Sequence, residues 1–292
     1  MTTPPADQTA TAAPSAIPAP DGASRTPTTP ATPQVRPIGW GAPLGWLVRG
    51  ARDMCAFWGI ALFYGFCFWT MALILGAVFR SRPEYTMSIV SGCLLVGPFL
   101  AMGLYDVSRR RELGDTPALS HSITCWDNHM GSMGLLMLVL MVLELLWGRA
   151  SLVVFAVFFK TGMPSTTGVL QAIFSAGNWE FVLVYMAVGG IFATLVFSTM
   201  VVSVPMILDR DTDAVTAAIT SIRVVYENTG VMLVWAALIV VLTGLALWPW
   251  GAGLLVVGPW LGHASWHAYR DAVGWPELVD APEPPATVSN RH

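Results

Sequence analysis

The sequence has few charged residues. Only 11% of its 292 residues are Asp, Glu, Lys or Arg, whereas soluble domains carry about 25%. Hydrophobic residues make up 54% of the chain, and the mean hydropathy is +0.60. This composition excludes an ordinary soluble domain and indicates a protein that lies in a lipid bilayer. The formal net charge of −3 and the lack of a basic stripe also argue against a nucleic-acid partner.

Motifs that carry catalytic chemistry are missing as well. The four cysteines form no Cys-x-x-Cys pair, so we interpret them as free thiols. There is no nucleophile with a base at suitable spacing, no phosphate-binding loop and no zinc-protease pattern. We therefore expect no enzyme.

Both ends of the chain lack apolar segments. Residues 1–37 are rich in Pro, Thr and Ala and contain no h-region of a signal peptide. They predict a disordered cytoplasmic tail, and residues 276–292 predict a second disordered tail. Between them, residues 38–275 form the predicted membrane domain.

Six apolar runs approach the roughly 20 residues that a helix needs to cross a bilayer. The last two are joined by "LWPWGAG", where Pro249 and the glycines favour a tight turn. The expected fold is an all-α, polytopic transmembrane bundle of six helices. The expected spans are 54–79, 86–108, 132–159, 179–208, 230–249 and 251–268.

The basic residues set the orientation of this bundle. With the N-terminus inside, eleven of the fifteen Lys and Arg residues lie in inner segments and three lie in outer loops. Cytoplasmic segments carry the excess of positive charge. We therefore expect both termini in the cytoplasm of a bacterium and the bundle in its inner membrane.

An internal repeat is visible in the sequence. "LVGPFLAMGLYDVSRR" (95–110) aligns without gaps to "VVGPWLGHASWHAYRD" (256–271). Amphipathic segments at 43–58, 117–130 and 213–226 each precede an apolar hairpin. The pattern predicts three units, each an amphipathic helix plus a helical hairpin, around an axis along the membrane normal. The amphipathic helices are expected at the inner interface or beneath the bundle.

These segments resemble a known family. "VSVPMILDRDTDAVTAAITSIRVVYENTG", "GPWLGHASWHAYR" and "GPFLAMGLYDVSRRRELG" are similar to bacterial six-span inner-membrane proteins grouped as domain of unknown function 2189. The resemblance extends over about residues 38–274. It implies an inner-membrane location and six helices, and it implies no activity.

Two histidines end the second copy of the repeat. His263 and His267 share a helix face at i, i+4, a spacing that can hold one metal ion. A haem more often takes one histidine from each of two helices. Their repeat counterparts are Met102 and Asp106. Hydrogen-bonding or interfacial histidines are the favoured interpretation, and a transition-metal or haem site is the alternative.

One acidic residue is expected deep in the membrane. Glu144 lies about 18 Å into the third span by helical rise, and an acid at that depth is a functional-site hypothesis. It could carry a proton or bind a cation, or it could be a protonated carboxyl bonded to a neighbouring helix. Arg149 lies nearer the outer end. Candidate binding residues are Glu144, Arg149, Asp106, His263 and His267.

Prolines inside the spans predict kinks or helix breaks. The candidates are Gly97, Pro98, Pro205, Gly258 and Pro259. Proline removes a backbone donor and frees a carbonyl. Discontinuous helices at matching repeat positions point to a transporter site, although kinks also serve packing.

Three functions remain open at this point. The favoured one is binding or transport of a small solute, ion or lipid, with no cofactor. The alternatives are an accessory or assembly subunit of a larger membrane complex, for example a respiratory one, and a haem- or metal-binding protein. Expected partners are the lipid bilayer and either further copies of the chain or a larger complex.

Overall fold

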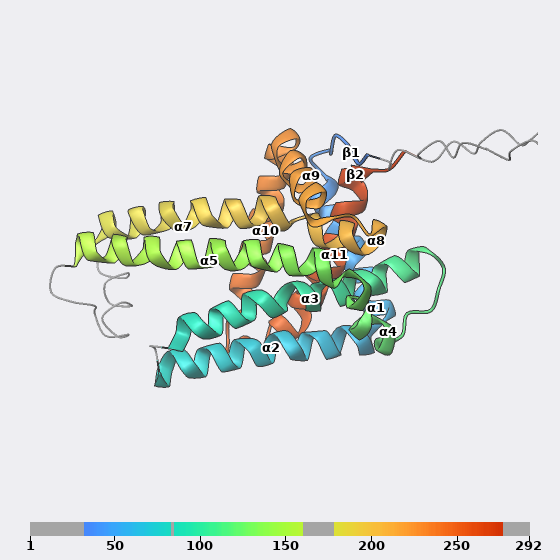
Figure 1. Ribbon diagram of the computed structural model, residues 1–292. Helices are drawn as coiled ribbons and strands as arrows, with labels where there is room; N and C mark the ends of the chain where they lie inside the picture. The colour runs from blue at the N-terminus through green and yellow to red at the C-terminus, as the bar shows by residue number, and fades with distance from the viewer. Residues whose placement is uncertain (1–31, 83–84, 160–177, 277–292) are drawn as a thin grey trace, which may run out of the picture.

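The structure is a computed structural model that describes residues 32–82, 85–159 and 178–276. The helices α2, α3, α5 and α7 lie roughly side by side, and α10 and α11 are drawn at a steep angle to them (Figure 1). The long helices are α2 (Trp58–Ser81), α3 (Thr86–Glu112), α5 (Met130–Phe158), α7 (Trp179–Met200), α10 (Thr229–Ala246) and α11 (Leu254–Ala272). The short elements are α1 (Ala42–Ala56), α4 (Leu119–Thr124), η2 (Asp127–His129), α8 (Ser203–Arg210), α9 (Ala214–Glu227), β1 (Gln34–Val35) and β2 (Val273–Gly274).

Five stretches of the described chain are long and apolar enough to cross a membrane. They are Trp58–Ser81, Ser88–Glu112, Leu119–Phe158, Trp179–Arg210 and Thr229–Ala246. The all-α membrane fold is therefore confirmed, and the expected sixth span at 251–268 is not. The reason lies in α11, whose second half carries His263, Ser265, His267, Arg270 and Asp271 and packs inside the protein against α1, α2 and α3.

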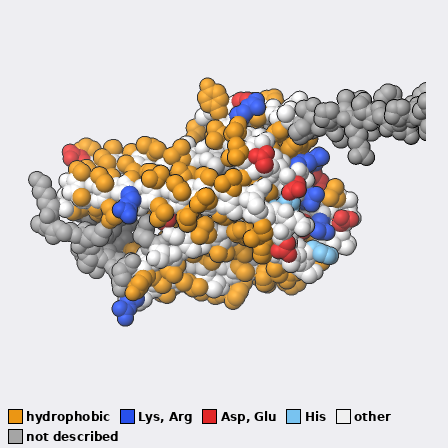
Figure 2. Space-filling view, in the orientation of Figure 1, with side chains coloured by type: hydrophobic (Ala, Val, Ile, Leu, Met, Phe, Trp, Pro, Cys, Tyr) orange, Lys and Arg blue, Asp and Glu red, His pale blue; other side chains and the backbone are white. Residues whose placement is uncertain are grey.

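Charge is segregated along the molecule. Figure 2 shows acidic and basic side chains gathered where α1, α8 and α11 meet, while the flanks of the long helices are mainly hydrophobic. Large apolar side chains are exposed on these flanks, among them Leu183, Met186 and Ile191 of α7 and Val153 of α5. Such continuous apolar surface is stable against lipid rather than water. We call the charged end the inner layer.

The amphipathic segments point their apolar stripes outward. In α1, Leu44, Val48 and Trp58 just beyond its end are exposed, whereas Trp46 and Asp53 are buried. The same holds for α9, where large apolar residues face away from the bundle and small or hydroxyl side chains such as Ala217 and Ser221 face it. An exposed apolar stripe at the inner layer fits a helix that lies in the membrane interface.

The two ends of the described chain meet. β1 pairs antiparallel with β2, so that Gln34 faces Gly274 and Val35 faces Val273. The amide of Ile38 also donates to Asn228 Oδ1 at 2.8 Å. The predicted tail over 1–37 is thus too long at its C-terminal end, because residues 34–37 belong to the fold. The rest of that tail and residues 277–292 lie outside the described residues.

Close helix contact explains two glycines. A Cβ on Gly65 of α2 would lie 2.1 Å from the carbonyl oxygen of Leu255, and one on Gly50 of α1 would lie 2.6 Å from the amide nitrogen of Ala264. Only glycine allows backbones to approach this closely. Both contacts hold α11 against its neighbours.

The prolines differ in their effect on the helices. α3 and α11 continue through Pro98 and Pro259, so no helix break occurs at Gly97-Pro98 or Gly258-Pro259. The chain does break after α7, and Pro205 then lies in the first turn of α8, where a missing backbone donor is tolerated. The amphipathic segment expected at 117–130 is broken into the short α4 and η2.

Candidate functional site

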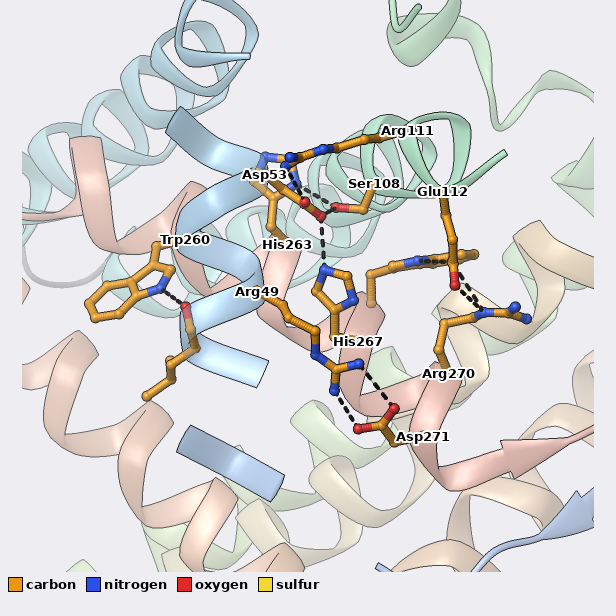
Figure 3. Close-up of polar contacts among 12 residues, drawn as sticks. Arg49, Asp53, Ser108, Arg111, Glu112, Trp260, His263, His267, Arg270 and Asp271 are labelled. Atoms are coloured by element: carbon orange, nitrogen blue, oxygen red, sulfur yellow. Dashed lines mark hydrogen bonds and ion pairs between the residues drawn. The ribbon is translucent and has the colours of Figure 1, made fainter. Parts of the chain in front are cut away.

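Three helices bring a buried carboxylate and its donors together in the inner layer (Figure 3). Asp53 of α1 is only 6% exposed. It accepts hydrogen bonds from Ser108 Oγ of α3 at 2.7 Å and His267 Nε2 of α11 at 2.9 Å. Arg111 Nη1 donates to its other oxygen at 2.6 Å. The buried charge is therefore fully compensated. We call Asp53, Ser108, Arg111, His263 and His267 the inner cluster.

The hydrogen bonds fix the tautomer of His263. Ser108 has a single hydroxyl proton, and it donates that proton to the ionised Asp53. The 2.8 Å contact between Ser108 Oγ and His263 Nδ1 must then be donated by the imidazole. His263 Nε2 is left as an acceptor, and it is buried with no partner among the described residues.

Burial and neighbours set the protonation of this cluster. Desolvation acts to raise the pKa of Asp53, but hydrogen bonds from His267 and Ser108 and the nearby imidazoles hold it below its ordinary value. His263 is fully buried. Desolvation of the imidazolium lowers the pKa of His263 to about 4, against the attraction of Asp53. At neutral pH His263 is therefore neutral and Asp53 is charged.

The Ser, His and Asp of the inner cluster do not form a catalytic triad. In a triad the acid orients the histidine, whose second nitrogen contacts the serine. Here Asp53 contacts Ser108 directly, and His263 uses only one nitrogen. No cavity described in the structure is lined by any of the three. Within the described residues no three His, Cys, Asp or Glu side chains are placed to hold a metal ion. The arrangement locks helices together.

More exposed ion pairs lie around the inner cluster and connect the same helices. Arg49 of α1 pairs with Asp271 of α11, which also accepts from Trp46 Nε1 at 2.8 Å. Glu112 of α3 pairs with Arg270 at 3.2 Å. These pairs are about one-third exposed, so each adds little free energy on its own. Together they join α1, α3 and α11.

A second candidate lies inside the apolar part of the bundle. A cavity of about 420 Å³ between α3, α5 and α7 is lined by Glu144. That side chain is 6% exposed, and its Oε2 has no hydrogen-bond partner among the described residues. The other polar residues of the lining are Ser88, Ser91, Trp147, Arg149, Ser151 and Tyr185. We call this space the Glu144 cavity.

The candidate residues thus separate into three places. Glu144 and Arg149 share the cavity, although no ion pair joins them and none links Arg149 to any other described residue. His263 and His267 lie in the inner cluster. Asp106 is 1% exposed and pairs with Arg110 at 2.8 Å, one turn along α3. It lies outside the Glu144 cavity.

Sequence reasoning missed Asp53, Ser108 and Arg111. Ser108 and Arg111 lie 55 and 58 positions from Asp53 along the chain, so no local spacing connects them. One signal was present in α1, where Trp46, Gly50 and Asp53 share a face at helical spacing. The larger apolar stripe of the same helix concealed it.

Comparison with known proteins relates part of the chain to a family. Residues 85–209 match the family described as "Predicted integral membrane protein (DUF2189)". The resemblance to DUF2189 is confirmed for this segment. No curated protein and no solved structure matches the chain.

The DUF2189 segment contains the Glu144 cavity and only part of the inner cluster. Every residue that lines the cavity falls between 85 and 209. Asp53, His263 and His267 lie outside this range. The protein is therefore an integral membrane protein of unknown function, and its DUF2189 segment contains Glu144.

Proposed function

We propose that this membrane protein binds a small cationic solute in the Glu144 cavity and that Glu144 exchanges the solute for a proton. The supporting observation is the buried Oε2 of Glu144, which lines a cavity of about 420 Å³ and has no partner among the described residues. Volumes of about 300–1,000 Å³ are usual for small-ligand sites.

The energetics favour such an exchange. An acidic side chain at the centre of a bilayer costs roughly 2.5–3.5 kcal/mol on insertion scales. A proton removes that cost, and so does a bound cation that takes the place of the proton. Hydroxyl groups of Ser88 and Ser151 line the same cavity and supply the oxygen ligands that hard cations or ammonium groups accept. The role needs no cofactor and no covalent step.

The fold is compatible with a protein exposed to both sides of the membrane. The β1–β2 pair places both ends of the described chain on one face, and the inner layer carries most of the arginines. By the positive-inside rule we assign this face to the cytoplasm of a bacterium. The order α1-α2-α3, α4-α5-α7 and α9-α10-α11 supports the proposed three-unit repeat, in which α11 returns as a buried helix.

Proteoliposomes containing an internal pH-sensitive dye test the proposal. External Na⁺ or K⁺ is added, and proton release from the vesicle lumen is recorded. The wild type is expected to respond to at least one of these cations, and Glu144→Gln is expected to respond to none. Glu180→Gln is the matched control, because Glu180 is exposed at the start of α7. Equal responses in wild type and Glu144→Gln, or no response in the wild type, would overturn the proposal.

A further inference from the structure

A larger cavity lies on the other side of α3. It has a volume of about 860 Å³, is bounded by α2, α3, α10 and the 247–253 turn, and shares no lining residue with the Glu144 cavity. Phe68, Met71, Leu75 and Phe79 of α2 form one apolar wall, and Val90 of α3 contributes to another. We call it the α2 groove.

The polarity of the α2 groove is concentrated at one end. Among the described residues, Arg80 is the only charged one in its lining, and its guanidinium lies 4.4 Å from the centroid of the Trp250 ring. Thr86 also lines the groove, and its hydroxyl oxygen is buried with no partner among the described residues. The groove therefore has an apolar body and a cationic, hydrogen-bonding end.

The position of Arg80 determines what kind of molecule fits. Arg80 lies in the last turn of α2, at the end of the molecule opposite the inner layer, where head groups meet water. From Phe79 down to Phe68 the wall extends about 16 Å by helical rise into the hydrocarbon region. A polar solute would find no partners along this wall, whereas an acyl chain matches it.

We propose that the α2 groove binds one anionic phospholipid of the outer leaflet, with the acyl chains along α2 and the phosphate against Arg80 and Thr86. The cation at the groove end selects for negative head groups, and the surrounding bilayer supplies the chains. The site is independent of the function proposed for Glu144.

Lipid counting tests the proposal. The protein is purified in mild detergent, mixed with equal amounts of phosphatidylglycerol and phosphatidylcholine, and weighed by native mass spectrometry. The wild type is expected to retain one phosphatidylglycerol. Arg80→Gln is expected to lose the preference for it by about fivefold, the contribution of one arginine near a membrane surface. Arg223→Gln is the matched control, because Arg223 is exposed on α9 and pairs only with Glu227 among the described residues.

A groove-filling variant separates lipid loss from misfolding. Gly76 lines the groove, and a Cβ there would meet no atom within 4 Å. Gly76→Phe should therefore fold, with an unchanged elution volume, and lose the bound lipid. Retention of phosphatidylglycerol by Gly76→Phe, or an unchanged head-group preference in Arg80→Gln, would overturn the proposal. So would a lipid-free wild-type dimer that Gly76→Phe converts to a monomer, because the groove would then be an interface between copies.

Discussion

Replacement of His263 should change how the stability of the protein depends on pH. The imidazole is fully buried, and its pKa falls from 6.5 to about 4 in the folded protein. Between these two values the unfolded chain binds a proton that the folded protein does not. The free energy of unfolding is therefore at its full value above pH 6.5 and decreases as the pH falls towards 4. The lowered pKa corresponds to about 3 kcal/mol over this window.

The assay is thermal unfolding in a neutral detergent between pH 7.5 and 4. A change of 3 kcal/mol lowers Tm by roughly 6–10 °C in a protein of this size. His263→Asn cannot titrate, so its Tm should fall less over this range by about that amount. His263→Gln serves as a second variant if the first folds poorly, and the comparison uses slopes with pH rather than absolute Tm values. Asp53 stays ionised throughout, because its pKa is lowered from 3.8.

His121→Asn is the control for this experiment. His121 is exposed on α4, so its replacement should leave the pH dependence of Tm unchanged. If wild type and both His263 variants lost stability in parallel on acidification, the interpretation of His263 as a buried neutral imidazole would be refuted. A steeper loss in the variants would refute it equally.

Further predictions concern packing, the inner cluster and topology. Gly65→Leu should lower Tm, because its Cβ would meet Leu255 and overpacking costs about 1–3 kcal/mol. Gly92→Leu is the control and should leave Tm unchanged, because its Cβ would meet no atom within 4 Å. Asp53→Asn should destabilise the protein by about 3–5 kcal/mol, because a buried pair loses one charge. An unchanged Tm would contradict the role of Asp53 in joining α1, α3 and α11. Green fluorescent protein fused to either terminus should fluoresce in bacterial cells, since both ends are assigned to the cytoplasm, and a dark C-terminal fusion in full-length membrane-inserted protein would contradict the orientation.

The sequence was a good guide to the helices that lie in lipid. The expected runs 54–79, 86–108 and 132–159 correspond to α2, α3 and α5 with shifts of a few residues at their ends. Lipid contact imposes uniform hydrophobicity on a whole segment, so the signal is local and long. The sixth expected span is not confirmed, since α11 packs against other helices and carries histidines and a carboxylate whose partners come from those helices.

The amphipathic helices show what an apolar pattern alone leaves open. In a soluble protein the apolar stripe of a helix faces the core. In α1 the apolar residues Leu44 and Val48 are exposed, while Trp46 and Asp53 are buried on the side that packs against α11. The membrane interface accepts the apolar stripe, which leaves the opposite face free to carry the polar cluster. The apolar stripe therefore predicts that the segment is helical, but it does not predict which face of the helix packs against the rest of the protein.

Two of the buried acids, Asp53 and Glu144, differ in how their charge is balanced, and this difference decides which is the better site. Asp53 accepts three hydrogen bonds, two of them from Arg111 and His267. Its charge is already satisfied, so a ligand would gain nothing by approaching it and would have to break the contacts between α1, α3 and α11. Glu144 has an oxygen with no described partner beside an open volume. No hydrogen bond among the described residues offsets the free-energy cost of burying this oxygen in its charged form. A bound cation or a proton can offset that cost. We therefore expect function at Glu144, and we expect His263 and His267 to serve the packing of α11.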